Sequence, residues 1–250
     1  MTLGVNKLSN RFTRIFGCQF IPDWRIERYH QTDYLRRLFD VKQIDLVFDV
    51  GANKGQYRDY LRAHIGFKGM ILSFEPHPEC LAEITRRSAT DDNWKVFPYA
   101  LGAQQGVLQF NLMRDSQFSS FHAPIQPERL DRGSDNVVER TVDVRIDTLD
   151  FVFDGLKRSF QFARPFLKLD TQGYDMEVLR GASTCIAKFP AIQAELSNIP
   201  IYSSIVGLGQ SIAELNQLGF DLGAIFPANP DQFPVVTDFD AYFINQESIE

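Results

Sequence analysis

The sequence predicts a doubly wound α/β domain, in which a mostly parallel, Rossmann-like sheet carries helices on both faces. From residue 44 onward, short apolar segments typical of buried strands alternate with segments of helical periodicity. The first apolar segment, 44–50, ends in a glycine turn that opens a helix. Open α/β sheets bind their ligands at turns of this kind, at the carboxyl ends of the strands.

The predicted elements follow in chain order. Apolar runs predict strands at 44–50, 69–74, 95–100, 142–146, 166–169, 191–196, 220–226 and 241–244. Helical spacing of apolar residues predicts helices at 26–39, 54–65, 78–88, 172–189 and 211–218. Segment 111–140 is polar, irregular and long for a connection, so we expect a lid-like excursion there.

Residues 1–40 differ from the rest, and we expect them to form an N-terminal helical extension to a main domain over 41–250. Leu8, Phe12 and Ile15 recur at helical spacing with basic residues between them. Such a helix either caps the main domain or lies on a membrane surface. Capping is the favoured interpretation.

Composition excludes several classes of function. The net charge is −6, whereas nucleic-acid binders usually carry a basic surface, so no nucleic-acid partner is expected. Cys18, Cys80 and Cys185 match no metal-binding spacing and are expected to be free thiols in a reducing compartment. No apolar run approaches the roughly 18 residues of a membrane span, and no signal peptide is evident. We therefore expect no transmembrane segment and a cytoplasmic location.

The glycine turn, 49–55 (DVGANKG), has G-x-x-x-G in place of the dinucleotide fingerprint G-x-G-x-x-G. Its glycines let the backbone approach a ligand closely, and the helix beyond offers unpaired N–H groups. Asp49 would repel a pyrophosphate but suits a ligand with an ammonium group, such as S-adenosylmethionine. We expect Asp49, Gly51, Asn53 and Gly55 to bind this cofactor.

Two further segments complete the expected cofactor site. Glu75 ends the second strand about 25 residues after the turn, where a carboxylate can accept both hydroxyls of an adenosine ribose. Ala100 and Leu101 follow the third strand and are small or apolar, so they could pack on the adenine ring.

Together these segments resemble the FkbM-type methyltransferases. The resemblance is carried, in order, by VFDVGANKGQY (47–57), ILSFEPHPE (71–79), YALG (99–102), FSSF (118–121), VRIDTLD (144–150), FLKLDTQGYDMEVLRGA (166–182) and IQAELSNIPIY (192–202). It implies a class I methyltransferase fold with an antiparallel C-terminal strand and S-adenosylmethionine bound at 49–55 and Glu75. It also implies O-methylation of a sugar, glycan or related metabolite.

The chemistry needs an acceptor oxygen about 3 Å from the methyl carbon, together with a base or a metal. Asp170 follows one predicted strand, Glu195 lies near the end of the next, and His122 lies in the irregular segment, so these three are the catalytic candidates. Asp170 could instead cap a helix beginning near 172, Glu195 could be structural, and His122 a loop residue. Mg²⁺ shared by Asp170 and Glu195 is left open. Thr171-Gln172-Gly173 stands where many members read Val-Glu-Gly, which removes one candidate base.

Two rival functions remain. A nicotinamide-dependent oxidoreductase shares the fold and the acidic residue of the second strand, but the third glycine at dinucleotide spacing is missing. A non-catalytic module that binds S-adenosylmethionine is disfavoured because Asp49, Glu75 and Asp170 are all present. The expected partner is a small-molecule or carbohydrate acceptor.

Overall fold

A computed structural model describes residues 26, 28–125, 137–229, 232 and 234–248 of the chain. Its main sheet has seven strands in the order β3-β2-β1-β7-β8-β10-β9. The strands are β1 (Leu46–Val50), β2 (Met70–Phe74), β3 (Trp94–Phe97), β7 (Pro165–Leu169), β8 (Ala191–Ser197), β9 (Phe220–Pro227) and β10 (Asp238–Asn245). β10 runs antiparallel to both neighbours, and the other pairings are parallel. This confirms the predicted mostly parallel sheet with an antiparallel C-terminal strand.

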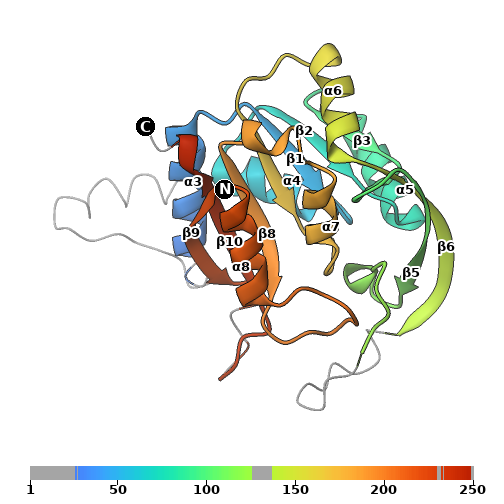
Figure 1. Cartoon of the computed structure of the whole chain (residues 1–250). Helices are drawn as coiled ribbons and strands as arrows, with labels where there is room; N and C mark the ends of the chain where they lie inside the picture. The colour runs from blue at the N-terminus through green and yellow to red at the C-terminus, as the bar shows by residue number, and fades with distance from the viewer. Residues whose placement is uncertain (1–25, 27, 126–136, 230–231, 233, 249–250) are drawn as a thin grey trace.

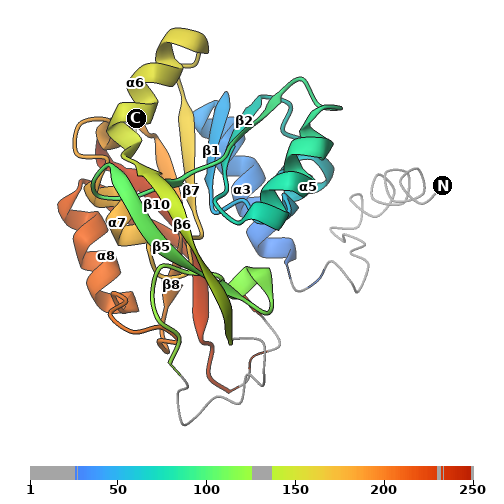
Figure 2. The same ribbon diagram turned by 90° about the vertical axis from the view of Figure 1, so that its right-hand side faces the viewer.

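Helices cover both faces of this sheet (Figures 1 and 2). One face carries α3 (Tyr29–Lys42), α4 (Gln56–Tyr60), the π-helical turn η2 (Leu61–Ile65) and α5 (Pro78–Ser88). The other carries α6 (Leu149–Ser159), α7 (Asp175–Arg180) and α8 (Leu208–Gln217). Alternate residues of β1 serve the two cores, because Val47 packs with the first group of helices and Phe48 with the second. The central strands β1 and β7 are buried along their whole length on both faces, as their apolar sequences predict, whereas the edge strand β9 is mostly exposed.

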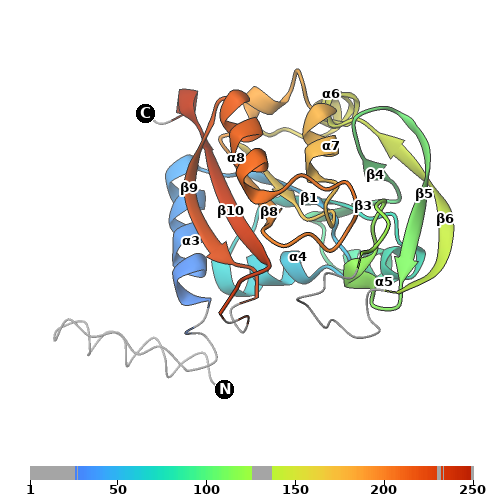
Figure 3. The same ribbon diagram turned by 60° about the horizontal axis from the view of Figure 1, so that its bottom comes forward.

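A second, smaller sheet lies at the opposite end of the molecule from β9 (Figure 3). It consists of β4 (Ala100–Leu101), β5 (Gly106–Met113) and β6 (Val138–Asp147), in the order β4-β6-β5. Strand β3 stops before Pro98, so the predicted strand 95–100 is wrong at its carboxyl end. Ala100 belongs instead to β4 of this second sheet. The excursion 111–140 begins and ends in strands. The predicted strand 142–146 is correct but belongs to this sheet.

The predicted helix 172–189 is largely wrong, since only α7 and the 3₁₀ turn η4 (Ile186–Lys188) form within it. Gln172 and Gly173 have φ angles of 53° and 91°, which no α-helix accommodates. Further on, the Asp150 carboxylate accepts the backbone N–H groups of Thr184, at 3.1 Å, and Cys185, at 2.8 Å. Those two N–H groups are therefore not available for the backbone hydrogen bonds that a continuing helix would need. The remaining 3₁₀ turns are η3 (Ser116–Phe118) and η5 (Gln246–Ser248).

Helix α3 crosses the predicted border between residues 40 and 41. Leu35 and Phe39 bury its inner face on the main sheet, and the Tyr34 ring lies 5.3 Å from that of Tyr242 in β10. The first and last parts of the described chain thus lie side by side (Figure 1). The helix expected around residues 8–16 falls outside the described residues. Within the described ranges, no helix has the length and apolar character to cross a bilayer.

Candidate active site

Five polar side chains form a row across the main sheet, on the face that α3, α4 and α5 cover. Asp49 of β1 lies in register with Ser73 of β2 and with Lys168 of β7. Lys168 is in turn paired with Gln193 of β8, and Gln193 with Tyr242 of β10. All five are buried, so the row places polar groups in the interior, directly beneath the carboxyl ends of the strands.

Lys168 joins the two central strands of this row. Its Nζ lies 3.2 Å from Asp49 Oδ1 and 3.3 Å from Asp170 Oδ2, and it donates to the Gly51 carbonyl at 3.0 Å. Burial opposes its charge, but the carboxylates of Asp170 and Asp49 outweigh that effect and raise the pKa of Lys168. Sequence reasoning missed this residue. A lysine inside the apolar strand FLKL is the signal that could have found it.

The glycine turn is packed tightly against its neighbours. Gly51 has φ 77°, and a Cβ added there would lie 1.9 Å from the Asp170 carbonyl oxygen. Gly55 has φ 81°, and its added Cβ would lie 2.9 Å from the Trp94 ring. Both glycines are therefore required by packing, whatever the turn binds.

A cavity of about 310 Å³ opens between this turn, helices α3 and α4, and the ends of β7 and β8. Five predicted site residues line it: Gly51, Asn53, Glu75, Asp170 and Glu195. Asp49 does not line it, because its carboxylate is buried beneath the turn on Lys168 and Ser73. Direct contact between Asp49 and a ligand stays a prediction.

Glu75 is held by the turn itself. Its carboxylate accepts the backbone N–H of Asn53 at 2.5 Å and that of His77 at 2.7 Å. Burial raises the pKa of Glu75 to about 7, although both hydrogen bonds favour the charged form. Glu75 also lines a second, largely apolar cavity of about 40 Å³ together with Ala100 and Leu101. Glu75 therefore stands between a polar and a largely apolar cavity.

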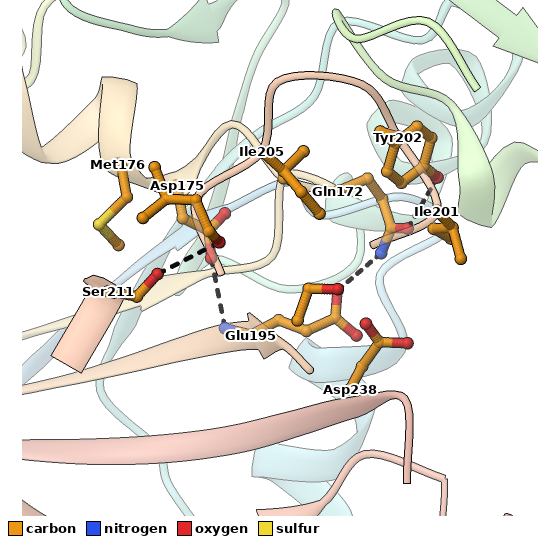
Figure 4. A pocket seen from close by; sticks show the side chains of 12 residues that line it. Gln172, Asp175, Met176, Glu195, Ile201, Tyr202, Ile205, Ser211 and Asp238 are labelled. Atoms are coloured by element: carbon orange, nitrogen blue, oxygen red, sulfur yellow. Dashed lines mark hydrogen bonds between the residues drawn. The ribbon is translucent and has the colours of Figure 1, made fainter. Parts of the chain in front are cut away.

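The two candidate carboxylates are linked by an amide. Gln172 Nε2 donates to Asp170 Oδ1 at 3.2 Å and to Glu195 Oε2 at 2.8 Å. The Tyr202 hydroxyl lies 3.0 Å from Gln172 Oε1, which orients the amide (Figure 4). Burial and the nearby Asp170 carboxylate raise the pKa of Glu195 well above its ordinary value. Asp170, by contrast, leaves 41% of its side chain exposed to the cavity mouth.

The capping role considered for Asp170 is wrong. Helix α7 begins only at Asp175, after Tyr174. The Asp175 carboxylate accepts the Thr171 backbone N–H at 2.8 Å, and its other oxygen accepts the N–H of Glu195 at 3.2 Å. Asp175 therefore orders the ends of β7 and β8, and the Asp170 side chain contacts Lys168, Gln172 and the cavity instead of a helix end.

His122 is not brought to the cavity that Asp170 and Glu195 line. Its ring packs 5.6 Å from that of Tyr174, and burial lowers its pKa. The segment that carries it is tied down by Ser120, whose Oγ donates to the Gln172 carbonyl at 2.7 Å. A catalytic role for His122 stays a prediction.

The donor set between Asp170 and Glu195 does not fit Mg²⁺. Both carboxylates already accept N–H donors from Gln172, and Asp170 also faces the Lys168 ammonium. The Lys168 ammonium would repel a divalent cation at the same place, and the Gln172 amide already uses one oxygen of each carboxylate. In the part of the chain that the structure describes, no three His, Cys, Asp or Glu side chains are grouped to hold a metal ion.

The chain is similar in sequence to known methyltransferases. The family model described as "Methyltransferase FkbM domain" matches residues 49–222. Methyltransferase sdnD of Sordaria araneosa is 26% identical over 172 residues, which cover 60% of this chain and 65% of that protein. The chain thus spans just under two thirds of that relative.

Solved structures show lower sequence identity. Methyltransferase FkbM from Methylobacillus flagellatus KT aligns with a TM-score of 0.49 and 16% identity, over 80% of this chain and 43% of that one. Magnesium protoporphyrin IX methyltransferase from Synechocystis PCC 6803, solved with bound SAM, aligns with a TM-score of 0.46 and 10% identity. That alignment covers 96% of this chain and 95% of the other.

Proposed function

The chain belongs to the FkbM methyltransferase family, and we propose that it transfers the methyl group of S-adenosylmethionine to a hydroxyl of a sugar, glycan or related metabolite. The observation that carries the proposal is the pair of carboxylates, Asp170 and Glu195, held by one amide at the mouth of a polar cavity. The same cavity contains the glycine turn.

The cofactor assignment is supported by the position of Glu75. A carboxylate can accept about four hydrogen bonds, and Glu75 uses two of them on the backbone of Asn53 and His77. The remaining two suit the 2′ and 3′ hydroxyls of a ribose. Ala100 and Leu101, which line the adjoining apolar cavity, suit the adenine ring.

The acceptor class is supported by the chemistry of the larger cavity. Beside its carboxylates, it is lined by side-chain amides from Gln31, Gln56 and Gln193 and by the aromatic residues Tyr57 and Tyr60. Amides donate hydrogen bonds to hydroxyls or accept them, carboxylates accept them, and aromatic faces pack on the apolar face of a sugar ring. A polyhydroxylated acceptor fits this wall better than an apolar one.

In the proposed reaction, bound S-adenosylmethionine supplies a methyl group activated by its sulfonium. The acceptor oxygen forms a bond to that carbon while the carbon–sulfur bond breaks, which leaves a methyl ether and S-adenosylhomocysteine. Asp170 takes the hydroxyl proton as general base, and Gln172 holds its carboxylate in place. Glu195 is the alternative base on the same amide, and burial raises its pKa above the ordinary range, which makes it a stronger base when it is deprotonated.

The test combines binding and turnover. Titration calorimetry should show binding of S-adenosylhomocysteine and none of NAD, and labelled S-adenosylmethionine should transfer its methyl group to neutral glycosides. Binding of NAD in place of S-adenosylhomocysteine would establish the oxidoreductase. Binding of S-adenosylhomocysteine without transfer to any of a broad set of glycans would favour the non-catalytic module.

A further inference from the structure

Asp240 lines the same cavity as Asp170 and Glu195, yet it lies on β10, outside residues 49–222 that match the family. It is in register with Glu195 of β8. Paired residues of antiparallel strands project to the same side, with Cβ atoms about 4.5–5.5 Å apart, and like charges placed so are destabilising. An arrangement that opposes folding at a cavity wall indicates a role in binding.

The Asp240 carboxylate is held in one orientation by two amides. Gln31 Nε2 donates to its Oδ2 at 2.8 Å, and Gln193 Nε2 donates to its Oδ1 at 3.0 Å. The Tyr57 hydroxyl donates to Gln193 Oε1 at 2.7 Å, which determines which way that amide faces. One hydrogen bond per oxygen is therefore used, and each oxygen keeps acceptor capacity for a group in the cavity.

Strand order separates this carboxylate from the expected cofactor site. Three strand spacings lie between β1, which leads into the glycine turn, and β10. At about 4.8 Å per spacing, that distance is about 14 Å. Asp170 and Glu195, at the ends of β7 and β8, lie between the two. A group that reacts at Asp170 would thus extend toward Asp240 on the side away from Glu75.

We propose that Asp240 is a specificity-determining residue, which binds two neighbouring hydroxyls of the acceptor, with Gln31 and Gln193 as its positioning residues. The inference rests on the proposed function. A carboxylate with one free lone pair on each oxygen matches a pair of adjacent hydroxyls, and such charge-assisted hydrogen bonds are strong. Because the carboxyl groups of Asp170 and Glu195 line the same cavity, an anionic sugar is disfavoured there. The acceptor is therefore an uncharged polyol at this end.

The experiment compares the wild type with Asp240→Asn and with Asp154→Asn, a control in the exposed surface of α6. The probes are the methyl α-glycosides of glucose, galactose, mannose and rhamnose, with methyl glucuronoside as the anionic probe. Methyl transfer from labelled S-adenosylmethionine is measured against glycoside concentration. Asp240→Asn should raise KM about tenfold or more and change kcat far less, since the proton-accepting residues are untouched. The control should match the wild type, and the glucuronoside should be the poorest acceptor.

Two further measurements separate recognition from structure. S-Adenosylhomocysteine affinity should be unchanged in Asp240→Asn, and its melting temperature should not fall, because the substitution removes a like-charge pair. Gln31→Ala should show a smaller rise in KM in the same direction. Equal KM values in the wild type and Asp240→Asn would overturn this inference alone. A wild type that binds S-adenosylhomocysteine but methylates none of the glycosides would overturn the proposed acceptor class, and this inference with it.

Discussion

Lys168 and Asp49 face each other on neighbouring strands at the centre of the sheet, with 3.2 Å between Nζ and Oδ1. Both side chains are buried, and the other Asp49 oxygen accepts the Ser73 hydroxyl at 2.9 Å. Because Lys168 also donates to the Gly51 carbonyl, this one ammonium joins the buried charge to the glycine turn. The stability of the fold and the shape of the site therefore depend on the same contact.

Lys168→Met should lower the free energy of unfolding by about 3–5 kcal/mol, because it leaves the Asp49 charge buried without its partner. Urea unfolding monitored by tryptophan fluorescence measures this change. The double variant Asp49→Asn with Lys168→Met removes both charges and should recover part of the loss. A single variant as stable as the wild type would show that the pair contributes little.

Gly51→Ala should be far more damaging than Gly66→Ala, although both glycines have left-handed backbone, with φ of 77° and 81°. No atom lies within 4 Å of a Cβ added at Gly66, so only the left-handed penalty of about 1–2 kcal/mol applies there. At Gly51 the added carbon would lie 1.9 Å from the Asp170 carbonyl oxygen. Melting temperatures and S-adenosylhomocysteine affinities of the two variants check this; equal losses would contradict it.

Affinity for S-adenosylhomocysteine should rise between pH 6 and pH 8. Burial raises the pKa of Glu75 to about 7, so the carboxyl is mostly protonated at pH 6 and mostly charged at pH 8. Only the charged form accepts both ribose hydroxyls while keeping its bonds to Asn53 and His77. Calorimetric titration across this range tests the point, with Glu75→Gln as the reference that should bind weakly and with little pH dependence. The same slope in both proteins would assign the effect to another group.

Asp170→Asn should reduce methyl transfer about a hundredfold or more, the usual contribution of a positioned general base. Stability should barely change, since the side chain caps no helix and Lys168 keeps Asp49 as its partner. Single-turnover transfer from labelled S-adenosylmethionine measures the rate. If the variant keeps most of the wild-type rate, Asp170 is not the general base, and Glu195 takes that role. The wild-type rate would then fall with decreasing pH at a less acidic pH than an ordinary glutamate gives, because its pKa is raised.

Much of the central sheet and of the expected cofactor site followed from local sequence. Strands β1, β2, β7 and β8 are buried on both faces, so they read as continuous apolar runs that need no knowledge of their neighbours. The glycine turn and Glu75 directly follow two of these strands, and their meeting in one cavity follows from parallel pairing alone.

Tertiary contacts decided the rest. The helix expected at 172–189 was limited by the left-handed Gln172 and Gly173 and by Asp150, a side chain from a different helix. The strand β5 was missed because most of its outward residues are exposed and its sequence lacks a continuous apolar run.

The polar residues of the site also depend partly on local sequence and partly on tertiary contacts. The residue types of Lys168 and Asp240 are evident in the sequence, but their partners are not. Lys168 acts through Asp49 because β7 pairs beside β1, and Asp240 faces Glu195 because β10 returns antiparallel between β8 and β9. Local sequence determines which segments form strands, since burial and turn chemistry act over a few residues. Which charges meet is decided only when strands far apart in the chain pair in register, because a one-residue shift would turn each side chain to the other face.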